Sequence, residues 1–380
     1  MHSEKVRRKP TSFLGLENGK PGLIAMIQPT LDFDLNQVKN IDITLDAQVR
    51  KFDELRQDVR KLKFVHVEPV QAYSPISFVS IDGGMMGINF DPFEVNFIEI
   101  ADSFGNETLK FLFPSTDEID EKQLAFLDNI PEIRQFLDIL RVKSIVSPLV
   151  FPIRPEFIMD IAELACIFNR IAQQAHEPLL VLKDGLLRNK FLKPEHKIHI
   201  IDLLKRQVHC KLVGVAKHSK IITLLNSALS IEKKIPLDAT GYIEIPLELE
   251  AQAYNWPRKL SSYSMGKLYV AKLSPRTNLV LTVEIPYNHV EDEEIYSENE
   301  ISEIFGCLIK DSAFSFPTLG YPQTIMRAHE KAARTGFVAS IWRQKIIDRF
   351  IDKAKTPQLK QLLQQSWLRD FVDKRDLGGT

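Results

Sequence analysis

Two apolar runs of the chain end alike, with an aspartate that is followed by a glycine. Asp82 follows the run in FVSIDGG, and Asp184 follows the run in LLVLKDG. Adjacent strands lie about 4.8 Å apart, so carboxylates at the ends of two neighbouring strands can share a divalent cation, which prefers oxygen ligands. Each Asp-Gly pair alone is typical of a simple turn, because glycine supplies a positive φ. The two pairs together, with a basic stretch after the second, favour a metal and phosphate site.

The basic stretch runs from Lys183 to Lys220 and holds ten Lys or Arg residues against three acidic residues. The whole chain has a net charge of −1, so attraction for nucleic acid must come from a local patch of this kind. We therefore predict that Arg188, Lys190 and Lys220 contact DNA. Residues 291–303 hold seven acids and no base, which is typical of a solvated loop and helix start, with contact to a partner as the alternative.

Apolar periodicity and turn residues predict the elements that must position these side chains. Helices are predicted over 45–63, 119–141, 156–175, 195–209 and from about 322 onward. Strands are predicted over 74–84, 85–90, 94–104, 179–182, 211–217, 267–274 and 278–285. Three consecutive strands followed by strand and helix in alternation indicate an α/β domain with a mixed sheet, without internal repeats or a clear linker.

Composition and motifs exclude several classes of protein. With 380 residues, of which 44% are hydrophobic and 26% charged, the chain is typical of a soluble globular protein. It has no run of about eighteen apolar residues and a charged N-terminal segment, which predicts no membrane span, no secretory signal and a cytoplasmic location. Cys166, Cys210 and Cys307 are too far apart for a disulfide framework or a thiolate zinc site. No GxxxxGKS/T, GxSxG, HExxH or GxGxxG motif occurs, so any ATPase must be another chain.

Five motifs in order resemble those of the NurA nucleases, which work with the hexameric HerA translocase in processing DNA ends. They are SFVSIDGG, an acid on the helix ahead of the second aspartate, LLVLKDG, GVAKHS and GYPQTIMRAHEKA, and they span about residues 75 to 335. The resemblance implies an RNase H-like core, in which helices flank a five-stranded mixed sheet. It also implies an N-terminal helix, and further strands and helices inserted before the C-terminal motif.

The same resemblance implies a division of the chain. Residues 1–44 are expected to form an N-terminal tail and irregular segment, and residues 45–335 a NurA-like nuclease domain. The core of that domain would occupy about 75–220, together with a motif helix at 322–335. A helical extension is expected over 336–380.

The chemistry that the resemblance implies is that of a manganese- or magnesium-dependent nuclease, in which carboxylates hold two metal ions at the scissile phosphate. Asp82 would be the bridging ligand, and Asp184 would complete the central pair. Glu163 is the helix-borne acid that the resemblance favours, whereas Asp160 and Glu156 lie on nearly the same helical face and stay open as alternatives. From the residues alone, each of these three acids is typical of a solvated helix face.

Two further residues have both an ordinary and a functional interpretation. His329 shares a helical face with Ile325 and Ala332, which by itself indicates a core histidine. The resemblance instead implies a neutral imidazole that binds metal or holds a water. Lys217 ends the GVAK strand and is either an exposed strand-end lysine or a contact to a DNA phosphate or the leaving group.

By resemblance, the chain is a 5′–3′ exonuclease and single-strand endonuclease in DNA end resection and repair. Its partners would be DNA, a HerA-type hexameric ATPase and a second copy of the chain, with the dimer enclosing a central channel. One alternative is a non-catalytic DNA-end-binding or adaptor subunit, although the retention of Asp82, Asp184 and His329 speaks against a decayed site. The other alternative is a different RNase H-like nuclease, such as a resolvase or an RNA-directed enzyme.

Overall fold

The structure is a computed structural model that describes residues 35–71, 76–90, 93–114, 119–151, 153–173, 177–189, 191–254, 264–353, 356–358, 360–361 and 365. Its contacts divide the chain into two compact units, Met1–Arg60 and Lys61–Thr380. The helix α2 (Leu35–Lys61) is the described part of the first unit and begins ten residues before the predicted start at residue 45. None of the described helices is both long and apolar enough to cross a membrane.

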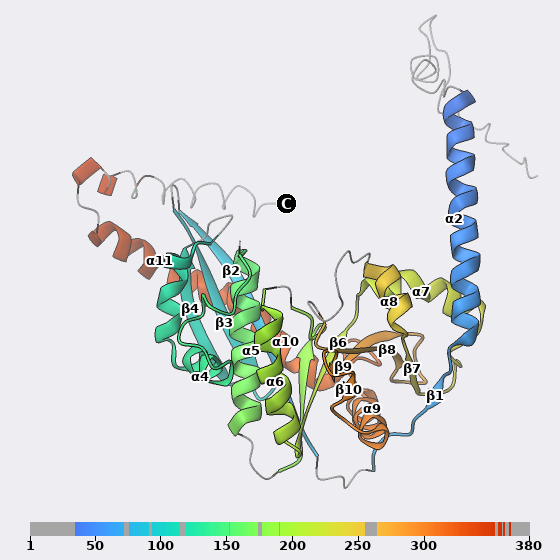
Figure 1. Ribbon diagram of the computed structural model, residues 1–380. Coiled ribbons are helices and arrows are strands. Elements are labelled where there is room, and N and C mark those ends of the chain that lie inside the picture. The colour runs from blue at the N-terminus through green and yellow to red at the C-terminus, as the bar shows by residue number, and fades with distance from the viewer. Residues whose placement is uncertain are drawn as a thin grey trace, which may run out of the picture. The chain divides into compact units, whose positions relative to one another are not determined.

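Five strands of the second unit form a mixed sheet, as the resemblance implies. Its strands are β4 (Glu107–Pro114), β3 (Phe93–Asp102), β2 (Ser77–Phe90), β5 (Leu179–Asp184) and β6 (Cys210–Ala216), in this spatial order. The first three are consecutive antiparallel neighbours, whereas β5 is parallel to β2 and β6 is parallel to β5. This mixed arrangement, with helices on both faces, is the predicted RNase H-like core (Figure 1).

The strand β2 differs from the prediction, because the segments 74–84 and 85–90 are parts of one strand of 14 residues. Gly83 and Gly84 do not form a turn but pair with Ile100 and Glu99 of β3. A side chain at Gly83 would come within 2.9 Å of Ile100 Cδ1, so neighbouring side chains fill the space beside it. The strand β4, which follows a short turn, is missed by the sequence prediction.

The chain after β6 extends the same sheet instead of building a separate one. β9 (Leu281–Asn288) pairs antiparallel with β6, and β8 (Gly266–Lys272), β7 (Gly241–Glu244) and β1 (Val65–His66) follow outward. The short β10 (Glu293–Glu294) pairs with β9. These strands therefore continue the five-stranded sheet to ten strands in the part of the chain that the structure describes.

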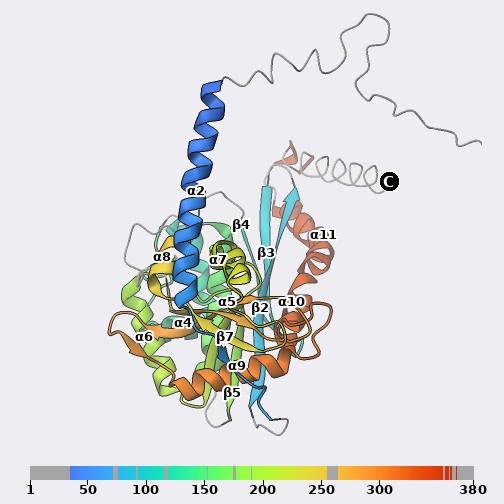
Figure 2. The same cartoon turned by 90° about the vertical axis from the view of Figure 1, so that its right-hand side faces the viewer.

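Helices cover both faces of this sheet (Figures 1 and 2). On one face lie α4 (Pro131–Ile139), α5 (Pro155–Gln173) and α6 (Pro194–Arg206), which share an apolar core with Val79, Ile81 and Val181. On the other face, α9 (Glu298–Ser312) and α10 (Gln323–Ala333) share a second core with Leu180 and Leu182. Alternate residues of β5 thus belong to opposite cores, as the period of two along a strand requires. The remaining helical elements are α3 (Glu121–Leu124), η1 (Ala125–Asn129), α7 (Lys220–Ile231), α8 (Leu247–Tyr254) and α11 (Thr335–Lys353).

One helical prediction needs correction, and two helices were not predicted. The single helix predicted over 119–141 is α3, η1 and α4, because the chain is extended at Ile130 and restarts as a helix at Pro131. The helices α7 and α8 were not predicted. The acidic segment 291–303 does contain a loop and a helix start, as predicted, and Ser297 and Glu300 form the capping box of α9.

The core near α6 contains a buried lysine. Lys197 is 6% exposed, and its Nζ donates to the carbonyl oxygen of Asn189 at 3.2 Å. Burial lowers the pKa of Lys197 to about 8, and the nearby carboxylate of Glu284 only partly opposes this effect. The folded protein therefore disfavours the charged form of this side chain.

We expect Lys197→Met to raise the free energy of unfolding at pH 7, by up to about 3 kcal/mol, because it removes the penalty of burying a charged amine. The penalty is complete below pH 8 and fades as the pH rises from about 8 toward 10.5, the pKa of a free lysine. Denaturant titrations of both proteins at pH 7, 9 and 10.5 should show the gap closing. Lys143→Met, at an exposed lysine, is the matched control. A gap that is constant with pH would show that Lys197 is not penalised by burial.

Candidate metal centre

The pairing of β2 with β5 brings the two aspartates together. The parallel register runs from Ser77 opposite Leu179 to Ile81 opposite Lys183, so Asp82 and Asp184 follow as the next pair and point to the same face. β5 ends at Asp184, whereas β2 continues beside β3 alone. The sequence predicts Asp82 at the end of its strand. It lies instead within β2, at the point where this strand no longer pairs with β5.

His329 reaches this pair from α10, on the face to which both aspartates point. Its Nδ1 lies 2.9 Å from Asp82 Oδ2 and 3.6 Å from Asp184 Oδ2. One ligand atom of each of the three residues lies within 4.8 Å of the others. The imidazole is 63% exposed, whereas the side chain of Asp82 is 11% exposed. His329 is therefore not a core histidine but the solvent-facing side of a small cluster.

The pKa of Asp82 reflects its burial and the closeness of Asp184. Burial raises the pKa of Asp82, and the negative charge of Asp184 raises it further. His329 and the backbone N–H of Gly83, which donates to Asp82 Oδ1 at 2.9 Å, oppose the shift without cancelling it. A cation placed between the two carboxylates would remove the repulsion.

Tyr321, just before α10, fixes the second aspartate. Its hydroxyl donates to Asp184 Oδ1 at 2.6 Å, and its ring is fully buried. Burial and the charge of Asp184 both raise the pKa of Tyr321, so the hydroxyl keeps its proton and remains a donor. Lys217, at the end of β6, places its Nζ 4.1 Å from the centre of this ring. Tyr321 belongs to the GYP motif, but the sequence analysis predicts no role for it.

Glu163 lies apart from the cluster, on the other side of the sheet. It belongs to α5, which covers the face to which Lys183 points, and its Oε2 lies 3.2 Å from Lys183 Nζ. The pKa of Glu163 is raised to about 8, mainly by burial. The positive charge of Lys183 opposes this rise, and the negative charge of Asp82 adds to it. Its Oε1 is buried without a hydrogen-bond partner among the described residues. Of the two alternatives, Asp160 is half-buried and Glu156 is exposed.

The donor set of the cluster fits a divalent cation. Two carboxylates and an imidazole are ligands that Mn²⁺ accepts, and Mg²⁺ favours the carboxylates. Asp82, Asp184 and His329 could hold one ion from a single face, and its charge would offset the repulsion that Asp184 exerts on Asp82. Glu163 could join only if its carboxylate reached around the strand ends from its pair with Lys183.

The predicted DNA contact Arg188 is not on the surface. Its side chain is 10% exposed, and its guanidinium pairs with Glu250 at 2.5 Å and with Glu284 at 3.5 Å. The same guanidinium lies over the ring of Tyr254, 4.3 Å from its centre. Two buried carboxylates need this cation, so Arg188 is a structural residue and its predicted contact with DNA phosphates does not fit the structure.

The other basic residues of the stretch do not form one continuous surface either. Lys183 and Lys197 are buried or nearly so. Lys217 is half-buried beside the aspartates, and Lys220 is exposed in the first turn of α7. Lys190 lies outside the described residues. Of the predicted DNA contacts, Lys217 and Lys220 therefore stay candidates.

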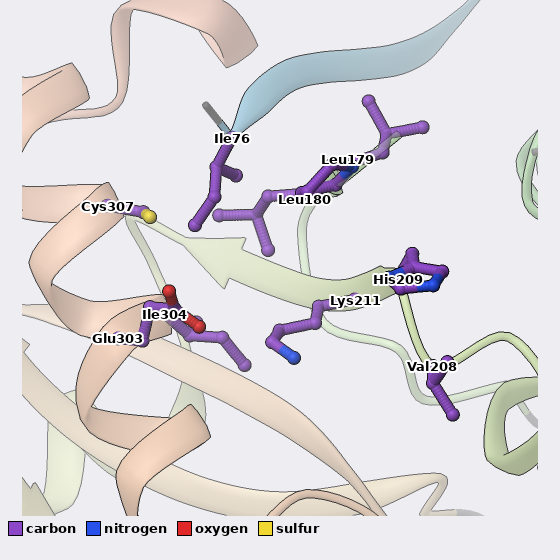
Figure 3. A pocket seen from close by; sticks show the side chains of 10 residues that line it. Ile76, Leu179, Leu180, Val208, His209, Lys211, Glu303, Ile304 and Cys307 are labelled. Carbon is purple, nitrogen blue, oxygen red and sulfur yellow. The ribbon is translucent and has the colours of Figure 1, made fainter. Parts of the chain in front are cut away.

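A pocket of about 230 Å³ lies at the opposite, amino-terminal ends of β5 and β6 (Figure 3). Ile76, Leu180, Ile304 and Cys307 give it an apolar wall, and Lys211 reaches its edge (Figure 3). It has no convergent carboxylates and contains none of the predicted site residues. The candidate metal centre is therefore at an open edge of the sheet and not in this pocket.

Comparison with known proteins finds relatives only among solved structures, since no family model and no curated protein matches the chain. The crystal structure of the NurA nuclease from Sulfolobus solfataricus is 14% identical, with a TM-score of 0.39, over 84% of this chain and 98% of that one. A second NurA crystal structure is 10% identical, with a TM-score of 0.40, over 85% and 99%. Marinitoga piezophila Argonaute with guide RNA and target DNA is 15% identical, with a TM-score of 0.24, over 69% and 30%. The likeness in every case is distant.

We expect Tyr321→Phe to weaken Mn²⁺ binding about 10- to 100-fold, because a hydrogen bond that orients a ligand carboxylate is lost. Isothermal titration with Mn²⁺ measures this directly, and the Mn²⁺-induced rise in melting temperature should shrink in parallel. Tyr296→Phe is the matched control, because its buried hydroxyl accepts from Leu212 N at 2.9 Å, away from the aspartates. The control should lose stability but keep Mn²⁺ affinity. Unchanged Mn²⁺ binding in Tyr321→Phe would show that the hydroxyl does not orient a ligand.

Proposed function

We propose that this protein is a metal-dependent nuclease that hydrolyses phosphodiester bonds of DNA. The observation that supports it is the convergence of Asp82, Asp184 and His329 where the parallel strands β2 and β5 part. Carboxylates at such an edge bind hard divalent cations, and ligands of α/β sheets commonly lie at the carboxyl ends of strands. The motifs that resemble NurA add the class of substrate.

The roles of the side chains follow from their positions. A bound divalent ion supplies Lewis acidity to a phosphate oxygen and makes a bound water more acidic. Asp82 and Asp184 hold the ion, and Tyr321 keeps Asp184 oriented through its 2.6 Å hydrogen bond. His329 is the exposed member, so it can bind the ion or orient a water on the side open to substrate. Lys217 lies beside Tyr321 and can contact a phosphate oxygen of the strand.

The number of ions is a finer part of the proposal. Two ions per site are implied by the resemblance, with Glu163 as the additional acid. The donors within 4.8 Å of one another suffice for the first ion. The buried Oε1 of Glu163, which has no hydrogen-bond partner among the described residues, is the feature that supports a second ion, because it would gain a partner.

We expect Asp82→Asn and Asp184→Asn each to reduce cleavage more than about 100-fold. Replacing even a residue that only orients a metal ligand can lower activity by up to about 100-fold. The change is nearly isosteric, so circular dichroism and melting curves should show a folded protein. End-labelled single- and double-stranded DNA with Mn²⁺, Mg²⁺ or EDTA is the assay. Asp128→Asn is the control, because Asp128 accepts from Ile145 N at 2.7 Å in another part of the domain and should keep activity. Activity near that of the wild type in either variant would refute the assigned site.

The same assay separates the alternatives. Metal-dependent shortening from 5′ ends, together with internal cuts in single strands, is the outcome that the resemblance implies. DNA binding without cleavage under any metal condition would favour a non-catalytic end-binding or adaptor subunit. Cleavage of RNA or of branched DNA in preference to linear DNA would favour another RNase H-like nuclease.

The partner part of the proposal is a homodimer that acts with a HerA-type hexameric ATPase in DNA end resection. Its support is the resemblance together with the lack of a nucleotide-binding motif in the sequence. We expect the two proteins to co-elute in size-exclusion chromatography, and ATP to increase degradation of long duplex DNA. A motor that cannot hydrolyse ATP should give no increase. Separate elution together with ATP-independent processive digestion would contradict the coupled motor.

A further inference from the structure

The chain turns back over β6 directly after Asp184. Gly185 has a φ of +87°, which favours glycine, and its N–H donates to the Val215 carbonyl oxygen at 2.8 Å. The same carbonyl oxygen lies 3.3 Å from the hydroxyl of Tyr321. Residues 185–188 therefore form a loop whose first residue is fixed to β6, next to one of the two aspartates. We call this segment the 185–188 loop.

The 185–188 loop crosses β6 where that strand has no side chain. A Cβ atom at Gly214 would lie 2.8 Å from the carbonyl oxygen of Gly185 and 2.9 Å from the backbone nitrogen of Leu187. Both atoms belong to the backbone, so they cannot yield to a side chain unless the loop itself moves. The absence of a side chain at residue 214 thus decides where the chain goes after Asp184.

Glu284 of β9 lies beside the loop at this crossing. It is the partner of Gly214 in the pairing of β6 with β9, so its side chain points to the face on which the loop lies. The side chain is fully buried, and its Oε2 lies 3.5 Å from Arg188 Nε. Its Oε1 accepts from Ser264 Oγ at 3.2 Å and from Met265 N at 3.3 Å. The carboxylate therefore joins the end of the loop to the chain at the start of β8.

This carboxylate also acts on the backbone of the loop. Burial raises the pKa of Glu284, whereas the charge of Arg188 and the backbone N–H groups of Met265 and Leu187 oppose the rise. Glu250 of α8 is the second carboxylate beside Arg188, at 2.5 Å from its guanidinium. No backbone N–H of the 185–188 loop donates to Glu250 among the described contacts. The two buried acids thus share one cation but differ in their contact with the loop.

The burial of Glu284 is not explained by packing alone. Charges taken out of water are only partly compensated by their mutual attraction, and an apolar side chain of similar volume is often at least as stable. Leucine or methionine at residue 284 could fill the space beside Gly214 without this desolvation. An apolar side chain could not attract the N–H of Leu187 or the guanidinium of Arg188. The property that only the carboxylate supplies is its hold on the loop.

We propose that Glu284 is a positioning residue for the metal centre, which holds the 185–188 loop on Gly214 and so fixes the backbone that carries Asp184. This inference rests on the proposed function, because it deepens the role of the same centre. Glu284 does not touch the ion. Its effect passes through Leu187 to Gly185, whose N–H is bonded to Val215, and from there to Asp184.

The test is Glu284→Gln, which keeps the size of the side chain and removes its charge. Isothermal titration with Mn²⁺, without DNA, should show about tenfold weaker binding, since supporting contacts of a metal ligand change affinity by roughly this factor or more. Glu250→Gln is the matched control, because it removes the other buried carboxylate from the same guanidinium. It should lower the melting temperature but keep Mn²⁺ affinity. Equal losses of affinity in both variants, or no loss in Glu284→Gln, would overturn the positioning role.

A second variant keeps the test open if Glu284→Gln does not fold. Gly214→Ala leaves every charge in place and displaces the loop by contact, so it should also weaken Mn²⁺ binding. Gly306→Ala in α9 is its control, because a Cβ atom there would be crowded by the carbonyl oxygen of Glu68 at 3.0 Å, outside the loop. Gly306→Ala should keep Mn²⁺ affinity. Gly214→Ala with the affinity of the wild type would overturn the proposal.

Amide hydrogen exchange gives a measurement that needs no metal. In EDTA, Gly185 and Leu187 should exchange faster in Glu284→Gln and Gly214→Ala than in the wild type, because the loop is less firmly held. The two control variants should leave this exchange unchanged. Exchange at both amides that is unaffected in folded Glu284→Gln would show that the carboxylate does not hold the loop, and would overturn the proposal.

Failure of this proposal can be distinguished from failure of the nuclease function. Titration and hydrogen exchange require no cleavage. Mn²⁺ binding that depends on Glu284, in a wild-type protein that cleaves no DNA, would refute the nuclease function and keep the positioning role. Cleavage that depends on Asp82 and Asp184, with Mn²⁺ affinity indifferent to Glu284 and Gly214, would refute the positioning role alone.

Discussion

The parallel pairing of β2 with β5 is the constraint on which the centre depends. It fixes the backbone of Asp82 beside that of Asp184, because each residue belongs to a strand held by backbone hydrogen bonds on its neighbours. Two carboxylates in such a place repel each other, and burial makes the repulsion stronger. The other contacts of the two carboxylates offset their negative charge. Gly83 donates a backbone N–H, Tyr321 donates a hydroxyl, and His329 offers an imidazole.

The alternation of side chains along β5 then divides the charges between two faces. Lys183 points toward α5 and pairs with Glu163, whereas Asp184 points toward α10 and accepts a hydrogen bond from Tyr321. Lys183 Nζ also donates to the carbonyl oxygen of Asp184 at 2.9 Å, so the two systems touch through the backbone. Two consecutive residues thus face opposite sides of the sheet, one in a buried ion pair and the other in the candidate metal centre.

The part of the centre that lies in short sequence motifs was predictable. Matched runs that end in Asp-Gly indicated strands, and the adjacency of these strands follows from the order of the core. His329 needed the family resemblance, because its spacing alone indicated a buried face. The role of Tyr321 could not be derived, since only the folded chain shows that this residue, two positions before α10, meets Asp184, the last residue of β5. Arg188 was misjudged because the carboxylates that bury it, Glu250 and Glu284, lie far along the chain.

The fold departs from the prediction where tertiary context overrides local signals. Gly83 and Gly84 are a turn signal, but a continuous partner strand and the side chains around Gly83 keep β2 extended. This departure matters for the centre, because an unbroken β2 carries Asp82 within the strand, where it is paired with Ala101 of β3. The extension of the sheet through β9 and β8 has a comparable effect. It brings the β8–β9 turn to the edge where β5 and β6 end, and the segment before α10 rests on that turn. The inserted strands therefore support the helix that delivers His329, and so they position the centre without contributing a ligand to it.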